Sequence, residues 1–221
     1  MGRDTYKQIN IINDLRVTQQ IYISQTRSTF QKPHPDIVFT ALAPYSKGIT
    51  AAAERGWRGI SSNYVNPQWV ATHLPKFMEG LSNAGLPEEP SKWSIAKSIF
   101  ISDDDQIAQH YAKSESGPYG FYFQNIMKKI KRGRGSQGLA LFKSYPDQPE
   151  EELTVQHSLD NGVIAGTVNS VVDQILALRE LVGPFGTLMY TGHDWADIPL
   201  SRRSMELMAT EVMPRVNKAL D

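Results

Sequence analysis

The sequence of 221 residues contains no cysteine, which excludes disulfides and cysteine ligation of a metal and fits a cytoplasmic protein. It also lacks a dominant sign of charge, because 23 basic residues balance 23 acidic ones. We therefore expect no general electrostatic attraction to nucleic acid or to a membrane surface. No run of about 18 apolar residues occurs, so no membrane span is predicted. The N-terminal MGRDTYKQIN lacks the apolar core of a signal peptide.

Patterns for metal or dinucleotide binding are also missing. The five histidines are scattered, with no HxxxH or HExxH pair, so no metal site is predicted. GRGSQG at 133–138 has the form GxGxxG, but a dinucleotide fingerprint needs a strand before it and a helix after it. A basic amphipathic helix precedes it instead. The cationic residues there favour a solvated face, although they could approach a phosphate or an anionic reductant.

Short apolar runs alternate along the chain with helix-like amphipathic stretches. The expected strands are 37–42, 57–65, 94–102 and 187–190, and the expected helices include 67–84, 166–183 and 199–220. The connections are too long for hairpins, which predicts an α/β fold with a parallel sheet and helices outside it. About four β/α units are present, whereas a closed eight-unit barrel needs roughly 250 residues.

The domain organisation follows from where this alternation holds. Residues 1–36 are predicted to be an irregular N-terminal segment, because weak alternation there ends in two prolines. Residues 37–221 carry the β/α units. Within them, the rhythm breaks at about 115–165, which predicts an insertion that contains one aromatic amphipathic helix.

Five blocks, taken in order, resemble the bacterial luciferase-like flavin-dependent monooxygenases. They are HPDIVFTALAPYSKGITAAAERGW, ISSNYVNPQWVATHLPKFMEG, KSIFISDD, VIAGTVNSVVDQILALRELVGPFGTLMYTGHDW and RRSMELMATEVMPRVN. The resemblance covers roughly residues 30–221 and matches the C-terminal half of that family. The segment 163–217 is its most specific part.

The resemblance implies a TIM (β/α)8 barrel, here only its C-terminal part. It also implies reduced FMN as cofactor, with F420 in some branches, and O2 as the oxidant of a small apolar organic substrate. A flavin reductase is the implied source of reduced flavin. The family's first half supplies early strands and usually an important histidine, and this chain lacks it. We therefore expect a chain inactive alone, which forms homo-oligomers or pairs with a chain supplying the missing half.

Two other functions remain open. The chain could be a non-catalytic half-barrel fragment or a partner subunit that stabilises a longer relative. It could also be part of an F420-dependent oxidoreductase without oxygen chemistry. The sequence does not select the substrate.

Three loops that follow expected strands are candidate sites, because chemistry in a barrel occurs where strands end. The resemblance places part of the flavin phosphate site at Tyr45, Ser46 and Lys47, where a helix N-terminus suits an anion. The alternative is an ordinary helix cap and a solvated lysine. In the second loop, Asn63 could contact the flavin edge or a substrate, or belong to a polar turn.

The third loop follows the last expected strand. His193 titrates near neutrality and is the candidate catalytic residue. Asp194 could orient it, and Trp195 could wall a flavin or an apolar substrate. The alternative is that Asp194 caps the last helix and Trp195 packs beneath it.

Overall fold

The computed structural model describes residues 6–10, 20–24, 31, 35–193 and 195–221. The chain divides into two compact units, Met1–Ile37 and Val38–Asp221. The first unit, for which no regular structure is predicted, contains two strands, β1 (Tyr6–Asn10) and β2 (Gln20–Ser24), which pair antiparallel.

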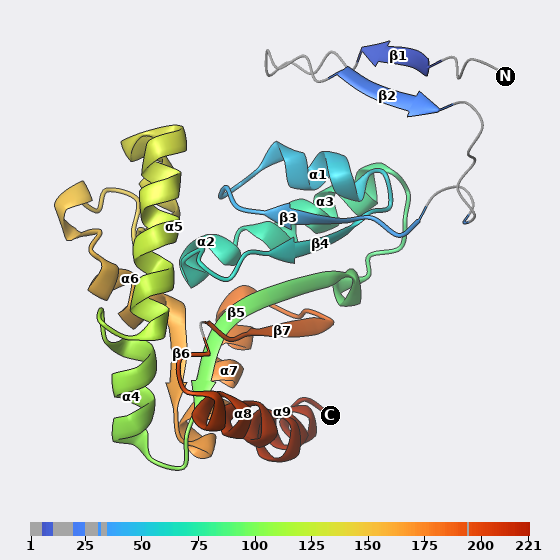
Figure 1. The fold of residues 1–221 in the computed structure, drawn as a ribbon. Helices are drawn as coiled ribbons and strands as arrows, with labels where there is room; N and C mark the ends of the chain where they lie inside the picture. The colour runs from blue at the N-terminus through green and yellow to red at the C-terminus, as the bar shows by residue number, and fades with distance from the viewer. Residues whose placement is uncertain (1–5, 11–19, 25–30, 32–34, 194) are drawn as a thin grey trace, which may run out of the picture. The chain divides into compact units, whose positions relative to one another are not determined.

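The second unit is an α/β structure with a parallel sheet of five strands (Figure 1). These are β3 (Val38–Ala41), β4 (Arg58–Ser61), β5 (Trp93–Ile101), β6 (Val163–Gly166) and β7 (Thr187–Thr191). The order is β3-β4-β5-β6, and β7 pairs with β5 as well. This confirms the predicted α/β class with a parallel sheet.

Strand β6 is the element that the sequence reading missed, so the sheet has five strands where about four units were expected. Its four residues lie at the end of the predicted insertion, and all of them are buried. A strand buried on both faces shows no alternation of apolar and polar residues. A run this short therefore offers little pattern to detect.

Nine helices occur in the described part of the second unit. They are α1 (Lys47–Ala53), α2 (Pro67–Val70), α3 (His73–Asn83), α4 (Asp105–Lys113), α5 (Pro118–Arg134), α6 (Val155–Gly162), α7 (Val168–Val182), α8 (Ile198–Leu207) and α9 (Met213–Leu220). A π-helical turn, Met208–Val212, joins α8 to α9. Short 3-10 turns occupy Pro90–Lys92, Ser136–Phe142 and Glu150–Glu152. No helix among the described residues is both long enough and apolar enough to cross a membrane.

The predicted helix 67–84 is divided between α2 and α3. Pro75 within this stretch predicts a kink, but the break lies before His73, where α3 begins. Pro75 is then the third residue of α3, within the first turn. A proline is tolerated there because the N–H that it lacks has no partner inside the helix.

Strand β5 is buried along its whole length and lies between two apolar clusters. Trp93 and Ile99 belong to the cluster that includes α3 and α7, whereas Phe100 packs with the aromatic rings of α4 and α5. Gly59 on β4 is required by this packing, because a Cβ there would lie 2.2 Å from the Trp93 ring. This packing fixes the position of β5 and therefore the direction of its polar side chains.

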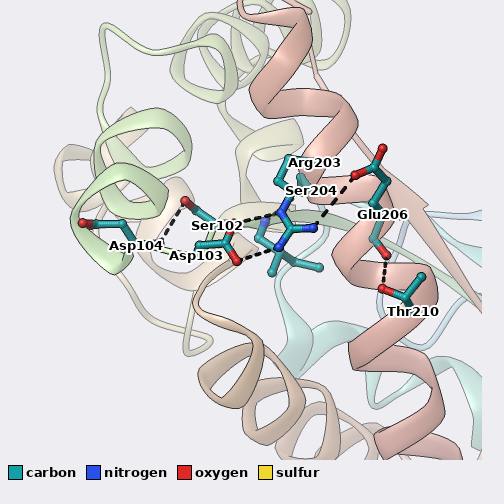
Figure 2. A network of polar contacts seen from close by, with 8 residues as sticks. Ser102, Asp103, Asp104, Arg203, Ser204, Glu206 and Thr210 are labelled. Atoms are coloured by element: carbon teal, nitrogen blue, oxygen red, sulfur yellow. Dashed lines mark hydrogen bonds and ion pairs between the residues drawn. The ribbon is translucent and has the colours of Figure 1, made fainter.

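Helix α8 is attached to the C-terminal end of β5 by polar contacts (Figure 2). The Arg203 guanidinium donates to both carboxylate oxygens of Asp103, at 2.8 and 2.9 Å. The buried Ser204 hydroxyl accepts from the Ile101 N–H at 2.8 Å. Because Asp103 lies two residues after the end of β5, these contacts hold the last helices beside the strand ends.

Candidate functional site

The imidazole of His193 meets the middle of the sheet. His193 comes two residues after the end of β7 and is 8% exposed. Its Nε2 lies 2.7 Å from the hydroxyl of Ser98, a fully buried residue of β5. The parallel pairing of β5 with β7 sets Ser98 opposite Thr191, which brings the two side chains to the same place.

Two further side chains extend this contact into a hydrogen-bonded chain. The Asn63 amide donates to the Ser98 hydroxyl at 3.0 Å, and the Tyr122 hydroxyl donates to Asn63 Oδ1 at 3.1 Å. Asn63 follows β4 and Tyr122 lies on α5, so four separate elements contribute. We call Tyr122, Asn63, Ser98 and His193 the rim network.

Two tyrosines of α5 enclose the imidazole. The Tyr122 ring stacks on it, with ring centroids 3.8 Å apart and an interplanar angle of 15°, and Tyr119 meets it edge-on at 4.8 Å. Burial lowers the pKa of His193 from 6.5 to about 4 and raises the pKa of Tyr122. At neutral pH the imidazole is therefore uncharged, so one ring nitrogen can donate and the other can accept.

An open hollow of about 500 Å³ adjoins the rim network, and we call it the rim hollow. It is lined by Pro118, Phe121, Tyr122, Asn125, Lys129, Gly192 and His193. Most of these residues belong to α5, so the predicted insertion forms one wall of the candidate site. In the described part of the chain, the lining combines aromatic surface, one cation and the imidazole, and it includes no acidic side chain.

Of the predicted site residues, only Asn63 joins His193 in the rim network. Ser46 lines a different hollow of about 240 Å³, which Arg134 of α5 also lines. Its side chain caps α1 by accepting from the Gly48 N–H at 3.2 Å, as the sequence predicted. Lys47 is exposed, and the Tyr45 N–H donates to the Thr72 hydroxyl. The flavin-phosphate role of this loop stays a prediction.

The other two predicted residues follow His193. Asp194 lies outside the described residues. The cap of α8 is Asp197, whose carboxylate accepts from the Leu200 N–H at 2.9 Å. Trp195 is 50% exposed, so it does not pack fully beneath the last helix. With His193 and Tyr119, it lines a second, narrow hollow beside β7.

Ser98 and Tyr122 are the members of the rim network that sequence reasoning missed. Ser98 sits in the apolar run SIAKSIFIS, where a small polar residue passes as ordinary strand sequence. Tyr122 belongs to the aromatic helix of the insertion, which reads as a packing face. A polar residue inside a run that is otherwise apolar was the available signal for Ser98, because buried hydroxyls need partners.

Comparison with known proteins finds similarity to monooxygenases. No family model matches the chain. It is 26% identical over 183 residues to 3,6-diketocamphane 1,6-monooxygenase of Pseudomonas putida, covering 82% of this chain and 47% of the relative. It is 41% identical over 196 residues to 4-hydroxyprotoasukamycin monooxygenase of Streptomyces nodosus subsp. asukaensis, covering 85% and 48%. The chain thus spans about half the length of the curated relatives it matches.

Solved structures show the same fold. The oxygenating constituent of 3,6-diketocamphane monooxygenase from Pseudomonas putida, in complex with FMN, superposes with a TM-score of 0.69 at 20% identity. That match covers 95% of this chain and 58% of the other. An F420-dependent tetrahydromethanopterin reductase from Methanopyrus kandleri gives a TM-score of 0.51 at 19% identity, covering 81% and 50%. Likeness at this identity establishes the fold and leaves the cofactor open.

Proposed function

Because the chain is similar, over most of its length, to about half of the luciferase-like flavin-dependent monooxygenases, we propose that it is part of such an enzyme. The proposed enzyme uses reduced FMN and O2 to oxidise a small apolar organic substrate, with a flavin reductase supplying the reduced flavin. The observation that carries the proposal is the 41% identity to a monooxygenase over 85% of the chain.

The proposed architecture is the C-terminal half of a TIM barrel. Five parallel strands with helices between them suit part of an eight-stranded barrel. One feature of the pairing departs from barrel order, since β6 and β7 both pair with β5. In a closed barrel, each strand lies between its two neighbours in the chain.

The rim hollow is suited to hold the flavin ring. Its volume of about 500 Å³ lies in the range of small-molecule sites. Phe121 and Tyr122 offer aromatic surface to a planar ring, and Lys129 and His193 would offer protons to the carbonyl and anionic oxygens that a flavin carries. When bound, reduced FMN supplies the electrons that activate O2.

The residues of this chain would position the flavin and control access to it. Tyr122 and Phe121 would form a wall of the flavin ring site, and α5 would shield it from water. His193, uncharged at neutral pH, would hold a flavin oxygen by a hydrogen bond. We propose that the flavin phosphate binds at Tyr45–Lys47, where Ser46 and the cationic Arg134 line the same hollow.

The proposal is tested by restoring the missing part. The chain is co-expressed with the half of the 3,6-diketocamphane enzyme to which it does not align, and the complex is purified. Mixing the complex with reduced FMN and oxygen should change the rate of flavin oxidation from that of free flavin. A folded complex that binds no flavin, or leaves this rate unchanged, would overturn the proposal. Titration with F420 in parallel separates the deazaflavin alternative.

A second candidate function is a non-catalytic half-barrel that serves as a partner subunit. The observation that favours it is the coverage of 47% to 49% of three curated relatives. In that case, the restored complex would form and bind flavin, but substitutions in the rim network would not change its affinity for flavin.

A further inference from the structure

The two ring nitrogens of His193 have different surroundings. Nε2 is held by Ser98 at 2.7 Å. Nδ1 makes no hydrogen bond with any residue in the described part of the chain. It is not sealed from solvent either, because the sealed atoms without a partner are Trp69 Nε1, His73 Nε2 and Lys97 Nζ. Nδ1 is therefore the nitrogen available to a ligand.

The rim network fixes which nitrogen carries the proton. The Tyr122 hydroxyl donates to Asn63 Oδ1, so the amide nitrogen of Asn63 is left to donate to Ser98. Ser98 is fully buried, and since its oxygen already accepts from Asn63, we infer that its own hydroxyl proton is donated to His193 Nε2, 2.7 Å away. A neutral imidazole that accepts at Nε2 carries its proton on Nδ1.

We propose that His193 is a neutral hydrogen-bond donor, whose Nδ1–H binds a ring carbonyl oxygen of a planar ligand in the rim hollow. The identity of this ligand as a flavin rests on the proposed function, whereas the protonation of Nδ1 does not. Ser98, Asn63 and Tyr122 are positioning residues, because they act on the ligand through the orientation of His193.

The composition of the rim hollow points to this class of ligand. No carboxylate lines it among the described residues, while the Lys129 ammonium and the His193 Nδ1–H both offer protons. The Asn125 amide nitrogen is already engaged with the Phe121 carbonyl oxygen at 2.7 Å. A ligand that satisfies these two donors must therefore present acceptor oxygens, and the aromatic rings of Phe121 and Tyr122 in the lining favour a flat shape.

The uncharged state of the imidazole determines what kind of donor His193 is. Burial holds the pKa of His193 at about 4, so at neutral pH the ring is uncharged and donates without bringing a full positive charge to the ligand. The groups that face it are the phenols of Tyr119 and Tyr122, with Lys129 in the same hollow. No acid among the described residues contacts the ring to favour its protonation.

The tautomer can be measured directly on the 221-residue chain. Long-range ¹H–¹⁵N correlation spectra at pH 7 report which imidazole nitrogen is protonated, and His193→Gln identifies its signals among the five histidines. We expect Nδ1 in the protonated range and Nε2 in the unprotonated range. Protonation of Nε2 would mean that His193 donates to Ser98 instead of accepting from it. That result would overturn the proposal.

Variants of Ser98 separate positioning from simple packing. Ser98→Ala should replace the single tautomer with a mixture, because Nε2 then loses its donor, and Ser98→Thr should restore it. Ser94→Ala, a small buried serine on the same strand, should leave the tautomer unchanged. A folded Ser98→Ala chain that keeps a pure Nδ1–H tautomer would contradict the assigned role of Ser98.

The ligand contact is tested with oxidised FMN on the restored complex. Bound FMN should shift the His193 Nδ1 resonance and slow the exchange of its proton with water. Bound FMN with an unperturbed Nδ1–H would overturn the donor role. Failure of FMN to bind would count against the proposed function and, with it, the flavin as ligand, while the tautomer is decided by the chain alone.

Discussion

Individual buried residues provide the chemistry of the candidate site, and some of them lower the stability of the chain. His73, Lys97 and His193 are titratable side chains that are almost entirely covered, and burial lowers the pKa of each. For His193, the covered position yields an uncharged donor at a candidate site. For Lys97, which has no hydrogen-bond partner in the described part of the chain, it yields only a cost to folding.

Lys97 should make stability depend on pH above neutrality. Burial lowers its pKa from 10.5 to about 7, so between these values the unfolded chain holds more protons than the folded chain. Stability therefore rises with pH through this window. Lys97→Met should stabilise the chain at pH 7 by an amount on the order of 4 kcal/mol and flatten the rise. Urea unfolding between pH 7 and 10 measures both effects.

The control for this prediction is Lys218→Met, since Lys218 is exposed on α9. It should change neither the stability at pH 7 nor its pH dependence. A Lys97→Met chain that is less stable than the original would show that the ammonium has a partner in solution.

The two buried histidines should make the stability of the chain depend on pH in the acidic range. His73 and His193 both have a pKa lowered from 6.5 to about 4, so as pH falls through this window the unfolded chain takes up protons that the folded chain does not. Stability should fall by roughly 2 to 3 kcal/mol for each histidine. Unfolding curves for His193→Asn should show a shallower decline than the original. His110→Asn, at an exposed position on α4, should not.

At the scale of elements, the sequence predicted the parts with a complete local signal. Helix α7 has a regular apolar face and a glycine after its last turn, and it was predicted within two residues. Strand β5 was recognised as an apolar run. Two features were not predicted, the break between α2 and α3 and the short strand β6. Both depend on tertiary packing, and the local sequence pattern carries no information about that packing.

The start of α4 offers a test of these local signals. The Asp104 carboxylate accepts from the N–H groups of Gln106 and Ile107, at 2.7 and 3.2 Å. Asp104→Ala should lower the unfolding free energy by about 1 kcal/mol, because two N–H groups of the first turn lose their acceptor. Asp105→Ala, one residue later, should cost clearly less in chemical denaturation. Equal losses would contradict the assignment of Asp104 as the cap.

At the scale of the whole chain, the sheet has strands with only one partner. In the described part of the chain, β3 pairs with β4 alone and β7 with β5 alone. Val38 on β3 is 55% exposed, and Met189 on β7 is 50% exposed. Open strand edges with apolar side chains favour association with another chain.

The chain alone should therefore associate with itself at micromolar concentration. Val38→Lys combined with Met189→Lys should shift it toward monomer, because charge on an edge opposes pairing. Ile107→Lys, an exposed position on α4, is the control and should have little effect. Sedimentation equilibrium gives the masses. A stable monomer that unfolds cooperatively would argue against a half-barrel that needs a partner.

The central claim is that this chain forms part of a flavin site around His193. Titration of the restored complex with oxidised FMN, followed by flavin fluorescence, tests it most directly. We predict saturable quenching that neither half gives alone. His193→Gln should weaken binding by about fivefold to tenfold, as the loss of roughly one hydrogen bond implies, while His110→Gln should leave it unchanged. Absence of binding, or binding that the His193 substitution does not alter, would contradict the account.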